Sequence, residues 1–177
     1  SDLVRSHGAD PGRIYLGGFS NGASMAFRAG AELPGLVAAI GPVAGHCWVA
    51  PAPSAQPVPA LMIYGGRDPL NPPQGGEVKT PWGSVEYHPP VLESFDRWRA
   101  FNRCAGEPQT TATDGVREFR ATGCAPDGDV RCVIVDDLGH HWPGGPRLLP
   151  PWIAGPASTR VDGARLLWDF FRAHRLG

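Results

Sequence analysis

Apolar residues occur along the chain in short runs that alternate with segments of helical period. The nearly continuous runs LVAAIGPVAG and ALMIY are typical of strands that are covered on both faces of a sheet. Bounding Gly, Pro and Asp residues help to predict strands at residues 13–16, 36–45, 60–64, 116–123 and 130–137. Apolar spacing of three or four and helical composition predict helices at residues 21–31, 91–103 and 162–177, and the Gly/Pro-rich segment 71–90 predicts an irregular excursion.

Strands that alternate with helices predict right-handed crossovers and an α/β fold, with a mostly parallel sheet flanked by helices. Ligands of such sheets bind beyond the carboxyl ends of the strands. The 177 residues, of which 42% are hydrophobic, suit one domain, so we expect residues 1–177 to form a single domain.

Candidate catalytic residues follow three of the predicted strands. Ser20 follows the first, Asp68 follows ALMIYGGR, and His140 or His141 follows VRCVIVDDLG. Side chains at one edge of a parallel sheet can form a hydrogen-bonded relay. A serine hydroxyl needs an adjacent base to become a nucleophile, and the base needs a third group to orient it. This order of residues therefore favours acyl-transfer chemistry.

The stretch GFSNG, residues 18–22, matches the G-x-S-x-G elbow, in which a serine sits in a strained turn between strand and helix. We expect both flanking glycines to leave room for the neighbouring strand and helix. The backbone N–H of Asn21 would face a developing oxyanion. The alternative role for Ser20 is that of a helix N-cap, because serine is favoured at that position.

Each of the other candidates also has a structural alternative. Asp68 in GGRDP is typical of a turn, and Asp136 and Asp137 are competing carboxylates that precede the histidines on their own strand and loop. One of His140 and His141 is expected to be the base. The remaining histidines lack a comparable strand-end position in the right order: His7, His46, His88 and His174.

Charge and composition exclude several classes of partner. Sixteen basic and seventeen acidic residues give a net charge of −1 without a basic cluster, which argues against nucleic-acid and anionic-membrane binding. The most apolar run is too short to cross a bilayer. The four cysteines lack metal-ligand spacing, so we expect neither a metal nor an organic cofactor. A small uncharged or modestly polar ligand fits best.

The motifs GGFSNGASMAF, GGRDPLNPPQGGE and GHHWPGG resemble those of the polyhydroxybutyrate (PHB) depolymerase-like, LpqC-type esterases. This branch of the α/β-hydrolases also includes feruloyl and acetyl-xylan esterases, and the similarity runs along nearly the full chain. The resemblance implies a serine ester hydrolase with Ser20 as nucleophile, His140 as base and Asp68 as acid, and leaves His141 at a variable position. It also implies that Trp142 is a wall of the substrate pocket, with core packing as the alternative.

The resemblance carries further expectations. It implies a disulfide between Cys104 and Cys124 and a secreted or periplasmic location, whereas the sequence itself leaves three complete pairings of the four cysteines open. Because Cys132 lies in a predicted buried strand and Cys47 near the pocket, we expect both to be free thiols. The substrate would be a hydroxyalkanoate polyester or oligomer, or a feruloyl or acetyl ester of a polysaccharide. Tryptophans in loops are consistent with an aromatic or polymeric ligand: Trp48, Trp82, Trp142 and Trp152.

The chain departs from this family at its start. Family members begin with several strands and a loop that donates the second oxyanion N–H, and no such segment precedes Ser1. We therefore expect the C-terminal portion of an α/β-hydrolase domain, with Asn21 as its one oxyanion donor and little activity by itself. The alternatives are a serine peptidase or thioesterase of the same fold, and an inactive truncated hydrolase-like module.

Overall fold

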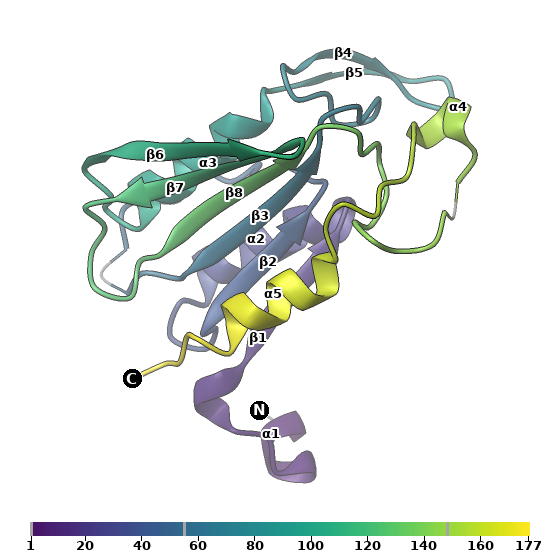
Figure 1. The fold of residues 1–177 in the computed structure, drawn as a ribbon. Helices are drawn as coiled ribbons and strands as arrows, with labels where there is room; N and C mark the ends of the chain where they lie inside the picture. Colours follow the sequence, from purple (N-terminus) through teal and green to yellow (C-terminus); the bar gives the residue numbers. More distant parts are fainter. Residues whose placement is uncertain (1, 55, 148) are drawn as a thin grey trace.

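The computed structural model describes residues 2–54, 56–147 and 149–177. Its main element is a six-stranded sheet with the strand order β1-β2-β3-β8-β7-β6 (Figure 1). The strands are β1 (Tyr15–Phe19), β2 (Ala39–Val43), β3 (Ala60–Gly65), β6 (Gly106–Thr113), β7 (Val116–Thr122) and β8 (Val130–Val135). β1, β2, β3 and β8 are parallel, whereas β7 is antiparallel to both β8 and β6. The mixed, mostly parallel sheet is that of an α/β fold.

Helices cover both faces of this sheet. α2 (Asn21–Glu32) and α3 (Val91–Phe101) lie on one face, and α5 (Gly163–Phe171) lies on the other (Figure 1). The remaining elements are α1 (Asp2–His7), η1 (Pro11–Arg13), α4 (Pro151–Ala154) and an antiparallel hairpin of β4 (Gly76–Lys79) and β5 (Val85–His88). The hairpin lies beyond the carboxyl ends of the parallel strands (Figure 1).

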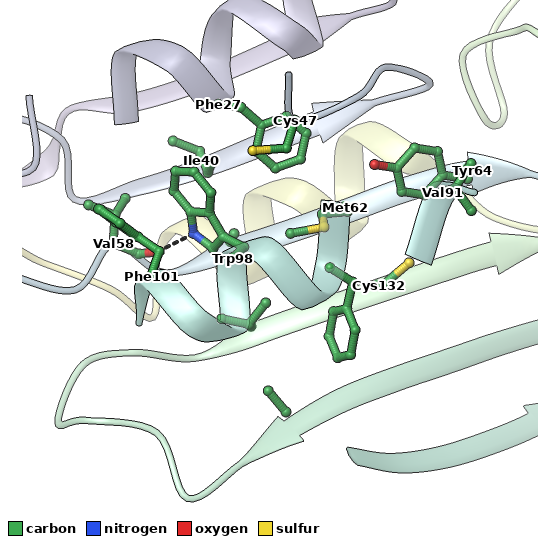
Figure 2. Close-up of a cluster of buried hydrophobic side chains, with 14 of the residues drawn as sticks. Phe27, Ile40, Cys47, Val58, Met62, Tyr64, Val91, Trp98, Phe101 and Cys132 are labelled. Atoms are coloured by element: carbon green, nitrogen blue, oxygen red, sulfur yellow. Dashed lines mark hydrogen bonds between the residues drawn. The ribbon is translucent and has the colours of Figure 1, made fainter. Parts of the chain in front are cut away.

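Trp98 of α3 is the largest fully buried side chain on the α2 and α3 face of the sheet. Its ring packs against Phe27 of α2, with 5.4 Å between the ring centroids. The indole Nε1–H donates a hydrogen bond of 2.8 Å to the Val58 carbonyl oxygen (Figure 2). The ring thus fills the core without leaving its polar atom unpaired.

On the opposite face, α5 packs closely against β2. A Cβ atom added to Gly41 of β2 would lie 2.7 Å from side-chain carbons of Leu167 and Phe171. Glycine at this position therefore lets α5 approach the sheet.

The predicted strands are confirmed with shifted bounds, and two sheet elements were not predicted. The first strand runs from Tyr15 to Phe19 instead of 13–16, because it continues through its glycines and pairs with the whole of β2. The predicted excursion 71–90 contains the β4–β5 hairpin. β6 was missed because most of its side chains are exposed and polar, so that its backbone pairing with β7 left no hydrophobic pattern.

The cysteines adopt the expected states. Cys104 and Cys124 form a disulfide, and Cys47 and Cys132 are free and buried. Within residues 2–54, 56–147 and 149–177, no helix is both long and apolar enough to span a membrane.

Candidate active site

Ser20, Asp68 and His140 lie on three loops at the carboxyl edge of the sheet. Ser20 directly follows β1, Asp68 follows β3, and His140 follows β8. Close backbone packing brings the last two loops together, since a Cβ atom added to Gly65 would lie 2.4 Å from the Leu138 carbonyl oxygen. Residues far apart in the sequence therefore meet at one edge.

The imidazole of His140 lies between the other two side chains. Its Nδ1 is 2.8 Å from Asp68 Oδ2, and its Nε2 is 2.9 Å from Ser20 Oγ. An ionised carboxylate only accepts hydrogen bonds, so Nδ1–H donates to Asp68, and Nε2 of the neutral ring then accepts from the serine hydroxyl. The three residues suggested by their order in the sequence thus form a continuous hydrogen-bonded chain.

Ser20 occupies the N-cap position of α2 but does not cap the helix through its side chain. Its backbone has φ 56° and ψ −118°, a conformation in which residues other than glycine are strained. Ser20 N–H donates to the Val43 carbonyl oxygen at 2.8 Å and fixes the turn to β2. The hydroxyl is therefore turned toward His140 instead of toward the helix N–H groups.

The two glycines that flank Ser20 differ in their spatial requirements. A Cβ atom added to Gly18 would lie 2.1 Å from the Gly22 carbonyl oxygen, so only glycine fits at this position. A Cβ atom added to Gly22 would meet no atom within 4 Å. The expectation that both glycines are needed for space is therefore wrong for Gly22.

Asp68 is a buried carboxylate that its own loop holds in place. Its Oδ1 accepts hydrogen bonds of 2.8 Å from the backbone N–H groups of Leu70 and Asn71, so that Oδ2 faces His140. The competing carboxylates lie elsewhere: Asp136 accepts from Arg117 and Asp137 from Arg160, each at 2.8 Å.

Of the adjacent histidines, only His140 contacts both Asp68 and Ser20. His141 is also buried, and its Nε2 lies 3.2 Å from the Gly155 carbonyl oxygen. The geometry therefore separates the two candidates that their positions in the sequence left open.

A cleft of about 280 Å³ opens beside Ser20 and Asn21. The β4–β5 hairpin contributes Trp82 and Glu86 to its walls, and the loop after β2 contributes Trp48. Asn21 begins α2, and the first N–H groups of a helix lack partners within the helix. Its backbone N–H therefore has no partner within α2, and Asn21 lines the cleft beside Ser20.

Two histidines that sequence reasoning set aside also line this cleft. His46 follows β2 and is only 1% exposed, and its ring lies 5.2 Å from that of His88 at the end of β5. Burial, followed by repulsion from the His88 ring when that ring is protonated, lowers the pKa of His46 from 6.5 to about 4, so that the His46 ring is neutral near pH 7. The position of His46 after the 36–45 strand is the signal that could have identified it.

A second cavity, of about 410 Å³, also has His140 in its wall. Trp142 lines it together with Phe19 and Leu149. Trp152 on α4 is 84% exposed and lines neither space. This second cavity is almost wholly apolar. The His140 imidazole therefore adjoins two spaces of different polarity, the cleft beside Ser20 and this cavity.

Among the residues that the structure describes, no group of three or more His, Cys, Asp or Glu side chains is arranged to hold a metal ion.

The site joins a serine, a histidine and a carboxylate by hydrogen bonds at the carboxyl edge of the sheet of an α/β protein, and comparisons with known proteins relate the chain to esterases. The chain is 32% identical over 187 residues to a protein of Nocardia uniformis subsp. tsuyamanensis named "Putative esterase NocK", covering 96% of this chain and 54% of that protein. It is 32% identical over 141 residues to "Feruloyl esterase B" of Piromyces equi, covering 74% of this chain and 25% of that protein. No family model matches the chain.

The chain therefore spans about half the length of the first relative and a quarter of the second. Both relatives are named as esterases, which supports an esterase family for this chain.

Proposed function

We propose that this chain is a serine carboxylic-ester hydrolase of the α/β-hydrolase fold, with Ser20, His140 and Asp68 as its catalytic triad. The observation that carries the proposal is the position of His140 between Asp68 Oδ2 and the strained Ser20, at 2.8 Å and 2.9 Å. The chain order Ser, Asp, His is that of α/β-hydrolases. The esterase names of the relatives support ester hydrolysis in general.

In the first half of the reaction, Ser20 Oγ attacks the ester carbonyl carbon while His140 Nε2 takes the hydroxyl proton. Asp68 stabilises the imidazolium through the Nδ1–H hydrogen bond. The tetrahedral intermediate then collapses, His140 gives its proton to the departing alkoxide, and an alcohol leaves. The acyl group remains on Ser20 as an ester.

In the second half, water attacks this acyl-enzyme and His140 Nε2 takes a proton from the water. Collapse of the second tetrahedral intermediate breaks the bond to Ser20 Oγ, which regains its proton from His140, and the carboxylic acid is released. The oxyanion of both intermediates would accept a hydrogen bond from Asn21 N–H at the start of α2.

The two spaces that His140 lines would take the two sides of an ester bound at Ser20. The cleft beside Ser20 carries polar groups, whereas the cavity lined by Trp142 is apolar. Feruloyl esters are the first substrates to test because one relative is named a feruloyl esterase. Acetylated polysaccharides and hydroxyalkanoate oligomers come next, and the Cys104–Cys124 disulfide supports an oxidising, secreted or periplasmic location.

The test of this proposal is labelling with a fluorophosphonate, which requires an activated serine. We expect the label on Ser20, its loss in Ser20→Ala, and strong reduction in His140→Ala. Ser24→Ala is the matched control, because Ser24 lines the same cleft without a contact to His140 Nε2. Folded protein that leaves Ser20 unlabelled, or ester turnover that survives in Ser20→Ala, would contradict the proposal. Thioester and peptide panels then test for the related hydrolases.

A further inference from the structure

Asn71 connects the candidate active site to the β4–β5 hairpin through its side-chain amide. Its Nδ2 lies 2.9 Å from the Ala44 carbonyl oxygen, and its Oδ1 lies 3.1 Å from His88 Nδ1. A carbonyl oxygen only accepts hydrogen bonds, so the amide nitrogen must face Ala44 and the amide oxygen must face His88. The orientation of the Asn71 amide is therefore fixed.

This orientation determines which nitrogen of His88 carries a proton. Asn71 Oδ1 can only accept, so the hydrogen between the two residues belongs to His88 Nδ1. In the neutral imidazole, Nε2 is then an acceptor with a free lone pair.

A polar atom in contact with this lone pair is also an acceptor. His88 Nε2 lies 3.5 Å from Glu86 Oε2, and the other carboxylate oxygen of Glu86 already accepts from Ser84 Oγ at 2.9 Å. With a neutral His88 ring, two acceptors face each other and no hydrogen lies between them, whereas a protonated ring would pair directly with the Glu86 carboxylate. A group that supplies a hydrogen between them would satisfy both atoms.

Both residues line the cleft that contains Ser20, and both are accessible. The His88 side chain is 14% exposed and that of Glu86 is 48% exposed. The described residues that line this cleft include no lysine or arginine, so a negatively charged ligand group would meet the Glu86 carboxylate without a compensating cation. The exposed ring of Trp82 adds an apolar surface beside the two acceptors.

We propose that His88 Nε2 and Glu86 Oε2 form a subsite that selects an uncharged ester carrying a hydroxyl group, which donates its hydrogen to this pair. This proposal rests on the proposed function in one respect: it takes the bound molecule to be an ester. Asn71 acts as the positioning residue, because it holds the His88 proton on Nδ1 and thereby keeps Nε2 available to the ligand.

The test measures binding in the Ser20→Ala background, so that it does not depend on turnover. The ligands are a graded series of alkyl butanoates and the same esters with a terminal hydroxyl group on either the alcohol or the acyl chain. Choline butanoate tests for recognition of positive charge. Quenching of tryptophan fluorescence reports binding, since Trp48 and Trp82 line the cleft.

We expect at least one hydroxylated ester to bind roughly tenfold more tightly than its alkyl isostere, because a hydrogen bond to a charged acceptor is stronger than one between neutral groups. Glu86→Gln should abolish this preference, since the glutamine amide can itself donate to His88 Nε2. The matched control is Tyr87→Phe on the same strand, which should retain the preference because the 72% exposed Tyr87 does not line the cleft.

Equal binding of alkyl and hydroxylated esters across the series would overturn the subsite, as would a preference that persists in Glu86→Gln. Choline butanoate as the preferred ligand would overturn the hydroxyl assignment in favour of a cation site. Nitrogen NMR of His88 in the wild-type protein gives an independent readout, in which a doubly protonated ring under the assay conditions contradicts the proposal. Fluorophosphonate labelling of the protein with Ser20 intact separately decides the proposed function.

Discussion

Gly45 packs directly against the backbone of Ser20, and a Cβ atom at this position would lie 2.2 Å from the Ser20 carbonyl oxygen. The loop after β2 thereby supports the strained turn that carries the hydroxyl. The conformation of Ser20 thus depends on a neighbour that the sequence motif around the serine does not include.

Gly45→Ala should displace this turn and lower the free energy of unfolding by about 1–3 kcal/mol, the usual cost of an overpacked site. Fluorophosphonate labelling of Ser20 should fall with it. Gly22→Ala is the control, because its Cβ atom meets open space and alanine favours a helix. Urea unfolding of the two variants measures the difference, and equal stability of both would contradict the packing argument.

Asp68→Asn should lower kcat for esters by about 10³–10⁴-fold. The amide oxygen would take the place of Oδ1, which accepts from Leu70 N–H and Asn71 N–H, and the amide nitrogen would then face His140. His140 would consequently carry its proton on Nε2, where it cannot accept the Ser20 proton.

Steady-state kinetics measures this effect. Asp137→Asn, which changes a carboxylate that interacts with Arg160 and Ser158 and has no contact with His140, should leave kcat within about twofold of wild type. A comparable loss of kcat in both variants would mean that the effect is not specific to the contact with His140.

Trp98→Phe should lower the free energy of unfolding by about 1–3 kcal/mol, through lost packing and the lost hydrogen bond to Val58. Trp168→Phe serves for comparison, since Trp168 is 58% exposed and should contribute little. Thermal unfolding followed by circular dichroism gives both values. A larger effect at Trp168 would show that the core has been assigned to the wrong ring.

His46 should make the protein less stable in mild acid. The unfolded chain binds a proton at this histidine below its ordinary pKa of 6.5, whereas the folded protein does so only near 4. Stability is thus fully present above 6.5 and falls as the pH is lowered toward 4. At about pH 5 the contribution of this group amounts to about 2 kcal/mol relative to neutral pH.

Urea unfolding of wild type and His46→Phe between about pH 7 and pH 5 measures this contribution, and the variant should show the shallower dependence. His7→Gln, a change at an exposed histidine, should behave like wild type. Identical slopes for wild type and His46→Phe would refute the assignment.

The contacts of Ser20, Asp68 and His140 could be predicted because each follows an apolar strand, and parallel strands end at one edge of a sheet. The choice between His140 and His141 rested on a motif, since adjacent residues share the same loop and only backbone geometry decides which ring reaches Asp68. The packing of Gly45 against Ser20 could not be predicted either, because it joins two separate loops whose approach depends on backbone geometry.

His88 could not be related to the site from its neighbours in the sequence. Its place in the cleft depends on the β4–β5 hairpin, whose register pairs Gly76 with His88. The hairpin did leave a local signal, since VKTPWGSVEY contains a Pro-Trp-Gly turn between short runs that include Val and Tyr. Even so, a hairpin alone does not indicate which part of the sheet it packs over.

The distance of 120 residues between Ser20 and His140 has a consequence for folding. β8 joins the sheet beside β3, from which it is separated by β4–β7 and α3 in the sequence, and pairings across such distances form slowly. On the proposed function, Ser20 would therefore become reactive only after β8 has paired with β3. Covalent labelling of Ser20 at successive times after dilution from denaturant would then measure the rate at which the native strand pairing is completed.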